Sequence, residues 1–259
     1  HTCRRLYEPT NIESKLPAIA VSGPFGAVKE QSSGLYAQTM AECGFLTLAF
    51  DPSYTGESGG EPRNVASPDI NTEDFSAAVD FLIAHPNVDA KRIGIIGICG
   101  FGGMGLNAAA MDTRIKATVA STMYDMSRVN ANGYFDAEDS AEVRRNKREA
   151  MNAIRTRDAQ NGTATPGTPG LPTSIKGDEP QFVKDYFDYY KTERAFHARA
   201  INSNGAWNPT MALSFINMPL LTYIHEIDNA VLLIHGENAH SRYFSRMPSN
   251  ASRATTRSY

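Results

Sequence analysis

The sequence predicts an α/β protein with a doubly wound, mostly parallel sheet and a helical lid insertion. Two observations carry this prediction. Five short apolar segments are continuous rather than alternating, as in strands buried on both faces, and helical segments lie between most of them. Strands that alternate with helices are typical of right-handed crossovers within one sheet. The predicted strands are residues 18–22, 46–50, 93–98, 117–121 and 231–234.

Helical segments connect the early strands. Residues 35–42 follow the first predicted strand, and residues 74–84 precede the third. In the second segment, apolar residues recur at helical spacing, which predicts a helix with one face packed against the sheet. These residues are Phe75, Ala78, Val79 and Leu82.

The alternation of strands and helices breaks between residues 127 and 215. A charged helical stretch at 141–157 is followed by a loop rich in Gly, Pro and Thr at 161–172 and then by a group of aromatic residues. We expect this part to form a lid over the carboxyl ends of the strands. The alternative is that its aromatic residues only form a small core of their own. These residues are Phe182, Tyr186, Phe187, Tyr189 and Tyr190.

This break divides the chain into four parts. We expect residues 1–126 to form the core sheet, 127–215 the lid, 216–245 a return to the core, and 246–259 a tail. The tail is rich in Ser, Thr and Arg and has almost no aliphatic side chains. Because burial cannot offset its ordering entropy, we expect it to be disordered or loosely held. No convincing strand precedes residue 18.

Composition excludes several classes of partner. The 259 residues carry a formal net charge of −3, which leaves no basic surface for nucleic acid or an anionic membrane. No apolar run reaches the ~18 residues that a bilayer span needs. Three cysteines, an odd number without metal-type spacing, predict free thiols in a reducing compartment, by default the cytoplasm. We expect neither a metal nor another cofactor.

Residues 93–111 carry the strongest functional signal. A β-branched apolar run ends at Cys99, and a glycine-dense turn and a helical run of small residues follow. A strand that turns sharply into a helix around a nucleophile is a nucleophile elbow, usually G-x-S-x-G. Here a thiol occupies the nucleophile position, and Phe101 stands where the pattern has a small residue. The alternative is a buried cysteine in an ordinary strand–turn–helix unit.

A cysteine nucleophile needs a base, because the thiolate attacks and a free thiol titrates near ~8.5. The N-terminus of the following helix would favour the anion, and a histidine held by a carboxylate would accept the proton. In the usual chain order of nucleophile, acid and histidine, Glu237 is the leading acid, as the only carboxylate after residues 231–234. His240, the only histidine after Glu237, is then the candidate base.

Three further residues complete the predicted site. Asp125, just beyond the strand at 117–121, is the reserve acid, and a helix or turn cap is an equal alternative for it. An oxyanion hole would use the backbone amide of Gly100 and one amide from the loop at 22–26. Because Pro24 has no N–H, we expect Phe25 to be the second donor.

Five motifs occur in this order over roughly residues 16–243. They are Ser-Gly-Pro-Phe-Gly (22–26), Asp-Pro-Ser-Tyr-Thr-Gly-Glu-Ser-Gly-Gly (51–60), Gly-Ile-Cys-Gly-Phe-Gly-Gly (97–103), Ser-Thr-Met-Tyr-Asp-Met-Ser (121–127) and His-Gly-Glu-Asn-Ala-His-Ser (235–241). Together they resemble the dienelactone-hydrolase-like α/β hydrolases of bacteria and fungi, including the fungal polyketide transferase group. The resemblance implies an α/β-hydrolase fold and a nucleophilic Cys99. It also implies earlier N-terminal strands and a last strand and helix that carry a histidine, so we expect this chain to be truncated at both ends and to lack them.

Two functions follow from these features. The first is a hydrolase or acyltransferase in which Cys99 attacks an ester, lactone or thioester. The second is a catalytically impaired hydrolase-fold protein that binds a small acyl ligand or has no activity, which the lack of a well-placed histidine favours. The expected partner is a small-molecule acyl substrate. Open sheet edges would also permit a homo-oligomer.

Overall fold

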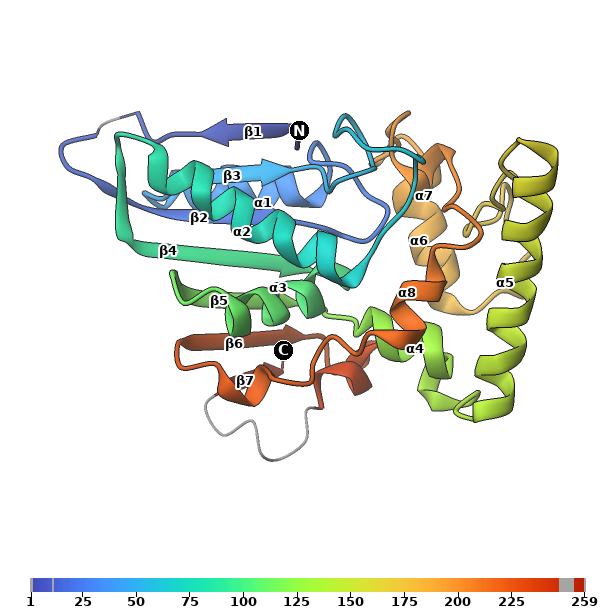
Figure 1. The fold of residues 1–259 in the computed structure, drawn as a ribbon. Helices are drawn as coiled ribbons and strands as arrows, with labels where there is room; N and C mark the ends of the chain where they lie inside the picture. Colours follow the sequence, from blue (N-terminus) through green and yellow to red (C-terminus); the bar gives the residue numbers. More distant parts are fainter. Residues whose placement is uncertain (1, 11, 247–253, 259) are drawn as a thin grey trace.

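The computed structural model describes residues 2–10, 12–246 and 254–258. They form a seven-stranded sheet in the order β1-β3-β2-β4-β5-β6-β7 (Figure 1). Neighbouring strands are parallel, except that β1 runs antiparallel to β3. The strands are β1 (Arg4–Tyr7), β2 (Leu16–Ser22), β3 (Leu46–Phe50), β4 (Val88–Ile98), β5 (Ile115–Ser121), β6 (Ala230–His235) and β7 (Ala254–Ser258). The five predicted strands and the doubly wound parallel sheet are therefore confirmed.

The two edge strands differ from the sequence prediction. β1 precedes residue 18, where no strand is expected, and pairs with β3 through four residues from Arg4 to Tyr7. It is short and partly exposed, so it lacks the apolar run that identifies a buried strand. β7 lies in the tail that is expected to be disordered, and its backbone pairs with β6. The rest of that tail, at 247–253 and 259, lies outside the described residues.

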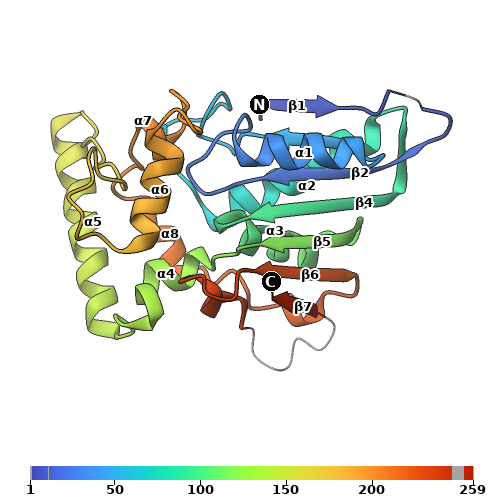
Figure 2. The same cartoon turned by 180° about the vertical axis from the view of Figure 1, so that it is seen from behind.

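Helices cover both faces of the sheet. Figure 2 shows α1 (Ser32–Glu42) on one face, and Figure 1 shows α2 (Pro68–Ala84) and α3 (Gly100–Met111) on the other. The larger apolar core lies between the sheet and the helices α2 and α3, and the apolar residues predicted on one face of α2 are buried in it. The smaller core lies beneath α1. Burial of both sheet faces explains why the central strands are continuous apolar runs.

Five further helices stand at the end of the sheet where the parallel strands finish (Figures 1 and 2). The first two are α4 and the long α5. A loop then leads to α6, which is rich in aromatic residues, and α7 and α8 follow. Ligands bind at this edge in open α/β sheets, and Cys99 lies here, directly after the last residue of β4. The helices are α4 (Met126–Asn132), α5 (Ala141–Asn161), α6 (Gln181–Lys191), α7 (Ile201–Asn204) and α8 (Ala212–Asn217). We refer to residues 126–217 as the lid.

The helices of the described ranges are also informative about membranes. None of them combines the length and the apolar character that crossing a bilayer would demand.

Candidate active site

The backbone of Cys99 is in a conformation that favours glycine. Its φ is 57° and its ψ is −124°, immediately before the first residue of α3. Three backbone hydrogen bonds hold it there: Cys99 N–H donates to Ser121 O at 2.9 Å, and Cys99 O accepts from Gly102 N–H and Tyr124 N–H at 2.9 Å each. A non-glycine residue held in such a conformation is typical of a functional turn. The predicted elbow is therefore present in its backbone geometry.

Glycines make this sharp turn possible. A Cβ on Gly97 would lie 2.1 Å from Phe101 O, and a Cβ on Gly102 would lie 2.6 Å from the Cβ of Met123. The strand and the helix therefore approach more closely than side chains permit. Phe101, which departs from the usual motif, is buried in the core, and its ring centroid lies 6.2 Å from that of Phe75. The bulky side chain at this position belongs to the larger core and contributes to its packing.

The Cys99 thiol lies beside the two predicted oxyanion donors. Burial raises the pKa of Cys99, while the backbone N–H groups of Phe25 and Gly100 each act to lower it. Two amides thus converge on the sulfur from different elements, one from the loop after β2 and one from the first residue of α3. The thiol is neutral at rest, contrary to the expectation of a sulfur ionised by the helix N-terminus, because desolvation outweighs the amides.

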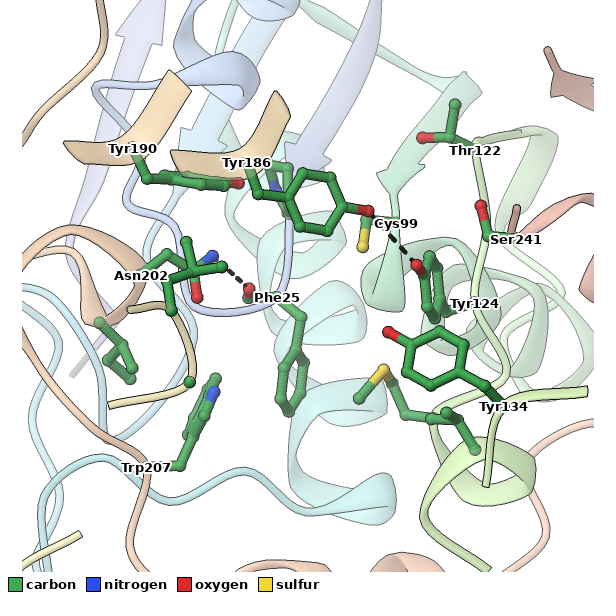
Figure 3. A pocket seen from close by; sticks show the side chains of 16 residues that line it. Phe25, Cys99, Thr122, Tyr124, Tyr134, Tyr186, Tyr190, Asn202, Trp207 and Ser241 are labelled. Carbon is green, nitrogen blue, oxygen red and sulfur yellow. Dashed lines mark hydrogen bonds between the residues drawn. The ribbon is translucent and has the colours of Figure 1, made fainter. Parts of the chain in front are cut away.

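Cys99 lies in a cavity of about 280 Å³. The core contributes Phe25 and Cys99, and the lid contributes aromatic side chains from α6 and from the loops around α7 (Figure 3). The rings of Phe25 and Trp207 stack at 4.2 Å. Among the described residues that line the cavity, none carries a formal charge. The lining residues are Pro24, Phe25, Cys99, Thr122, Tyr124, Met126, Val129, Tyr134, Gly170, Leu171, Tyr186, Tyr190, Ile201, Asn202, Trp207 and Ser241.

Tyrosines surround the thiol. Burial raises the pKa of Tyr124, Tyr186 and Tyr190, and a negative charge on the nearby Cys99 would raise each of them further. Figure 3 shows the hydroxyls of Tyr124 and Tyr186 close to the sulfur, and they lie 3.3 Å from each other. Because their pKa values are raised, these hydroxyls stay protonated and can donate hydrogen bonds. The polar part of the cavity is therefore made of neutral donors.

The structure does not bring the predicted acid and base together. His240 Nε2 lies 2.5 Å from Tyr124 Oη, and the His240 ring stacks on Phe182 at 4.1 Å. Burial lowers the pKa of His240, and the carboxylate that partly opposes this is that of Asp185. The side chain of Glu237 is exposed, and its backbone carbonyl accepts from Arg242. Within the described ranges, no histidine is hydrogen-bonded to the Cys99 sulfur.

Asp125 serves as a helix cap. It is the N-cap of α4, and its Oδ1 accepts from Arg128 N–H at 3.0 Å. Burial raises its pKa, and the backbone N–H groups of Arg128 and Ser127 oppose this rise. This bonding matches the capping alternative rather than a carboxylate that orients a histidine.

A model of one protein family accounts for most of the chain. The X-Pro dipeptidyl-peptidase (S15) family matches residues 4–239. The chain belongs to the S15 family. The protein PA2218 of Pseudomonas aeruginosa is 62% identical over 242 residues, which are 93% of this chain and 64% of that protein. In the crystal structure of PA2218 the similarity covers 100% of this chain and 85% of that one, with a TM-score of 0.92 and 54% identity.

This S15 family member also resembles fungal proteins over a smaller part of its length. Thiohydrolase aneE of Aspergillus aculeatus is 34% identical over 42% of the chain and 34% of that protein, and polyketide transferase grgF of a Penicillium species is 35% identical over 40% and 35%. The crystal structure of the α/β hydrolase GrgF has a TM-score of 0.73 at 17% identity, covering 100% of this chain and 89% of that one, which shows a common α/β-hydrolase fold. The chain spans less than two thirds of the length of each of these three curated relatives.

Sequence patterns alone do not identify several residues in and around the cavity of this S15 protein. Tyr124 precedes Asp125, and in that motif only the carboxylate is expected to have a role. Asn202 lies in a short polar helix that carries no motif. His235, near the predicted acid, is buried between Ser241 and Ser245, and burial lowers its pKa to about 4. The tyrosines of α6 are predicted as lid residues, but only the fold shows that Tyr186 and Tyr190 line the cavity of Cys99.

Proposed function

We propose that this protein is a cysteine-dependent hydrolase or acyltransferase that acts on an ester, lactone or thioester. The family and fold support acyl chemistry of this general kind. The finer assignment to the dienelactone-hydrolase-like group is part of the proposal and rests on the five motifs. The single observation that carries the proposal is the convergence of the Phe25 and Gly100 amides on the Cys99 sulfur, which lines the cavity.

The proposed reaction has two steps. The Cys99 thiolate attacks the acyl carbonyl carbon, and the negative charge that develops on the carbonyl oxygen is stabilised by the two amides. The alcohol or thiol leaves with a proton, and the acyl group remains on sulfur as a thioester. Water then attacks this thioester to release an acid, or a second alcohol or amine attacks it to give a transferred product. Both outcomes regenerate the free thiol.

The cavity indicates the kind of acyl group. Aromatic rings and neutral hydroxyls line it, and none of its described lining residues is charged. A carboxylate or ammonium within it would lose hydration without gaining an ion pair, which is costly. We therefore propose a neutral acyl group with planar or apolar parts that fits between Phe25, Trp207 and the α6 tyrosines.

His240 is the base that we propose for Cys99. In this conformation its Nε2 is hydrogen-bonded to the Tyr124 hydroxyl, which faces the cavity. A proton would therefore pass from the thiol to the Tyr124 oxygen while the Tyr124 proton moves to His240. Glu237 is exposed here and Asp125 is occupied as a helix cap, so neither contributes to this step. Replacing either His240 by Gln or Tyr124 by Phe should slow acylation about 100-fold at pH 7.

Mass spectrometry with an activated ester tests the nucleophile directly. The protein is mixed with p-nitrophenyl butyrate, and the acyl adduct on Cys99 and the release of p-nitrophenol are both measured. We expect a butyryl adduct on Cys99 and at least about a 100-fold loss of turnover in Cys99→Ala. Cys43→Ser, which removes an exposed thiol, is the matched control and should retain full activity. Turnover that survives in Cys99→Ala would refute the proposal.

A second function is favoured by the raised pKa of Cys99 and by the absence of a histidine bonded to it among the described residues. In this alternative the cavity binds a small acyl ligand without turning it over. The same experiment separates the two functions. Binding of the ester, seen as quenching of Trp207 fluorescence, without an adduct or p-nitrophenol release would support the binding function.

A further inference from the structure

The loop that supplies the Phe25 amide is held by three hydrogen bonds to successive carbonyls. Pro24 O, which shares a peptide plane with the Phe25 N–H, accepts from Ala27 N–H at 2.9 Å. The next two carbonyls accept from one residue of the lid: Phe25 O from Asn202 Nδ2 at 2.8 Å, and Gly26 O from Asn202 N–H at 3.1 Å. Figure 3 shows the bond between Asn202 and Phe25 within the cavity that Cys99 also lines.

The two segments are in close contact at this point. Gly26 has a φ of +83°, and a Cβ built on it would lie 2.5 Å from Asn202 Oδ1. Only glycine leaves room for the asparagine to reach both carbonyls. Asn202 itself is half-buried and also lines the cavity.

Neighbouring bonds hold the lid segment against the same loop. Gln31 Nε2 donates to Ala195 O at 2.6 Å, and Arg199 pairs with Glu30 at 2.9 Å. Asn202 is therefore part of a docked segment rather than an isolated contact. Of these lid contacts, the two hydrogen bonds from Asn202 to Phe25 O and Gly26 O lie nearest in the chain to the Phe25 amide.

We propose that Asn202 is a positioning residue that holds the Phe25 amide in the oxyanion hole, so that the hole is complete only when this lid segment is docked. This inference rests on the proposed function, because it assigns the Phe25 amide a role in acyl transfer. Fixing the carbonyls of Phe25 and Gly26 restricts rotation of the peptide that carries the Phe25 N–H. Without the Asn202 side chain, Phe25 O loses its partner and only the backbone N–H of residue 202 still binds Gly26 O, so the Phe25 amide no longer points steadily at the sulfur.

The pH dependence of Cys99 alkylation tests this inference without requiring turnover. Alkylation of the Cys99 peptide by iodoacetamide is followed by mass spectrometry between pH 6 and pH 11 in Asn202→Ala and Asn202→Leu. Since the Phe25 amide favours the thiolate, its displacement should move the alkylation profile of Cys99 up by about one pH unit. The limiting rate at high pH should not change, because alkylation builds no oxyanion.

The acylation kinetics provide a second readout. With p-nitrophenyl butyrate, kcat should fall about tenfold or more in both variants while KM changes less than about twofold, because the lost interaction acts on the transition state. Asn204→Ala, an exposed asparagine of the same helix α7, is the matched control and should behave as the unmodified protein. Circular dichroism melts of all three variants verify that they are folded.

Each outcome bears on a different proposal. If the unmodified protein does not cleave the ester, the proposed function fails, and the alkylation profile alone still decides the role of Asn202. If the ester is cleaved and both Asn202 variants match Asn204→Ala in profile and kcat, the inference is overturned and the proposed function stands. A shift in Asn202→Ala that Asn202→Leu does not show would trace to lost packing and would also overturn it.

Discussion

At the scale of single residues, two opposing effects set the state of Cys99. Removal from water disfavours the thiolate, and the Phe25 and Gly100 amides favour it, with a net rise in the pKa of the thiol. A substrate carbonyl would change this balance, because its oxygen would take over the amides as negative charge moves from sulfur to oxygen. In the proposed reaction the same two donors would therefore stabilise the thiolate first and the oxyanion afterwards.

The raised pKa predicts slow labelling of Cys99 at pH 6. Iodoacetamide reacts with thiolates, so a thiol with a raised pKa reacts faster only as the pH rises above the usual cysteine range. Exposed Cys43 in the same chain is the internal reference and should be labelled ahead of Cys99 at every pH up to about 8. Peptide mass spectrometry after timed quenching gives both rates. Fast labelling of Cys99 at pH 6 would show that the thiol is ionised after all.

His235 predicts a loss of stability in mild acid. Its ring is 2% exposed, Nε2 lies 3.0 Å from Ser241 Oγ and Nδ1 contacts Ser245 Oγ, and burial lowers its pKa to about 4. An unfolded histidine titrates near ~6.5, so between these values the unfolded chain binds more protons than the folded one. The stabilisation is thus complete above about pH 6.5 and is lost as the pH falls towards 4, by about 2 to 3 kcal/mol.

Urea denaturation at pH 7.5 and 4.5 measures this contribution. His235→Asn keeps a polar side chain between the two serines. Its unfolding free energy should fall less between these pH values than that of the unmodified protein, by most of the roughly 2 to 3 kcal/mol assigned to His235. His225→Asn, in which the replaced side chain is exposed, is the control and should keep the full pH dependence. An equal pH dependence in His235→Asn would contradict the assignment.

At the scale of elements, the junction of β4 and α3 predicts opposite effects for two glycines. A Cβ on Gly97 would lie 2.1 Å from the Phe101 carbonyl oxygen, a backbone atom that moves only if the elbow opens. A Cβ on Gly105, within α3, would have Ile95 Cδ1 as its nearest neighbour at an ordinary 3.5 Å. Gly97→Ala should cost about 3 kcal/mol or more, whereas Gly105→Ala should be neutral or stabilise by up to about 1 kcal/mol. Chemical denaturation of both variants checks this, and equal effects would mean that the elbow is not closely packed.

The same junction shows what the sequence can and cannot predict. The central strands and the elbow are visible because burial on both faces and close strand–helix contact demand apolar runs and glycines, as in residues 93–103. β1 and β7 are not visible, because an edge strand is held by backbone pairing that imposes no such pattern. That the Gly100 and Phe25 amides lie near the Cys99 sulfur also follows from the order of strand, turn and helix in the chain. Asn202 does not, because its role arises only when α7 docks on a loop 176 positions earlier in the chain.

At the scale of the whole molecule, a partly buried ion cluster joins the core to the lid. Lys29 Nζ lies 3.0 Å from Asp51 Oδ2, 2.5 Å from Glu57 Oε2 and 3.0 Å from Glu30 Oε1, and Arg199 of the lid reaches both glutamates. Burial alone would lower the pKa of Lys29, but the bonds to these carboxylates outweigh it and raise the pKa. Lys29 therefore stays protonated, and the cluster links the end of β3, the loop at 23–31 after β2, and the lid.

The cluster predicts very different costs for its two cations. Lys29→Met leaves Asp51, which is fully buried, without its ion-pair partner, so the unfolding free energy should fall by about 3 to 5 kcal/mol. Arg199→Met removes a cation that is 40% exposed, and since water screens such pairs the cost should be about 1 kcal/mol or less. Urea denaturation at pH 7 gives both values, and limited proteolysis of the loop at 162–180 reports on lid docking. Arg199→Met should be cut faster at that loop while its core stays folded, because only the lid loses an anchor. If Arg199→Met instead unfolded the whole chain as readily as Lys29→Met, the lid and the core would be one cooperative unit, and docking could not act separately on the loop at 23–31.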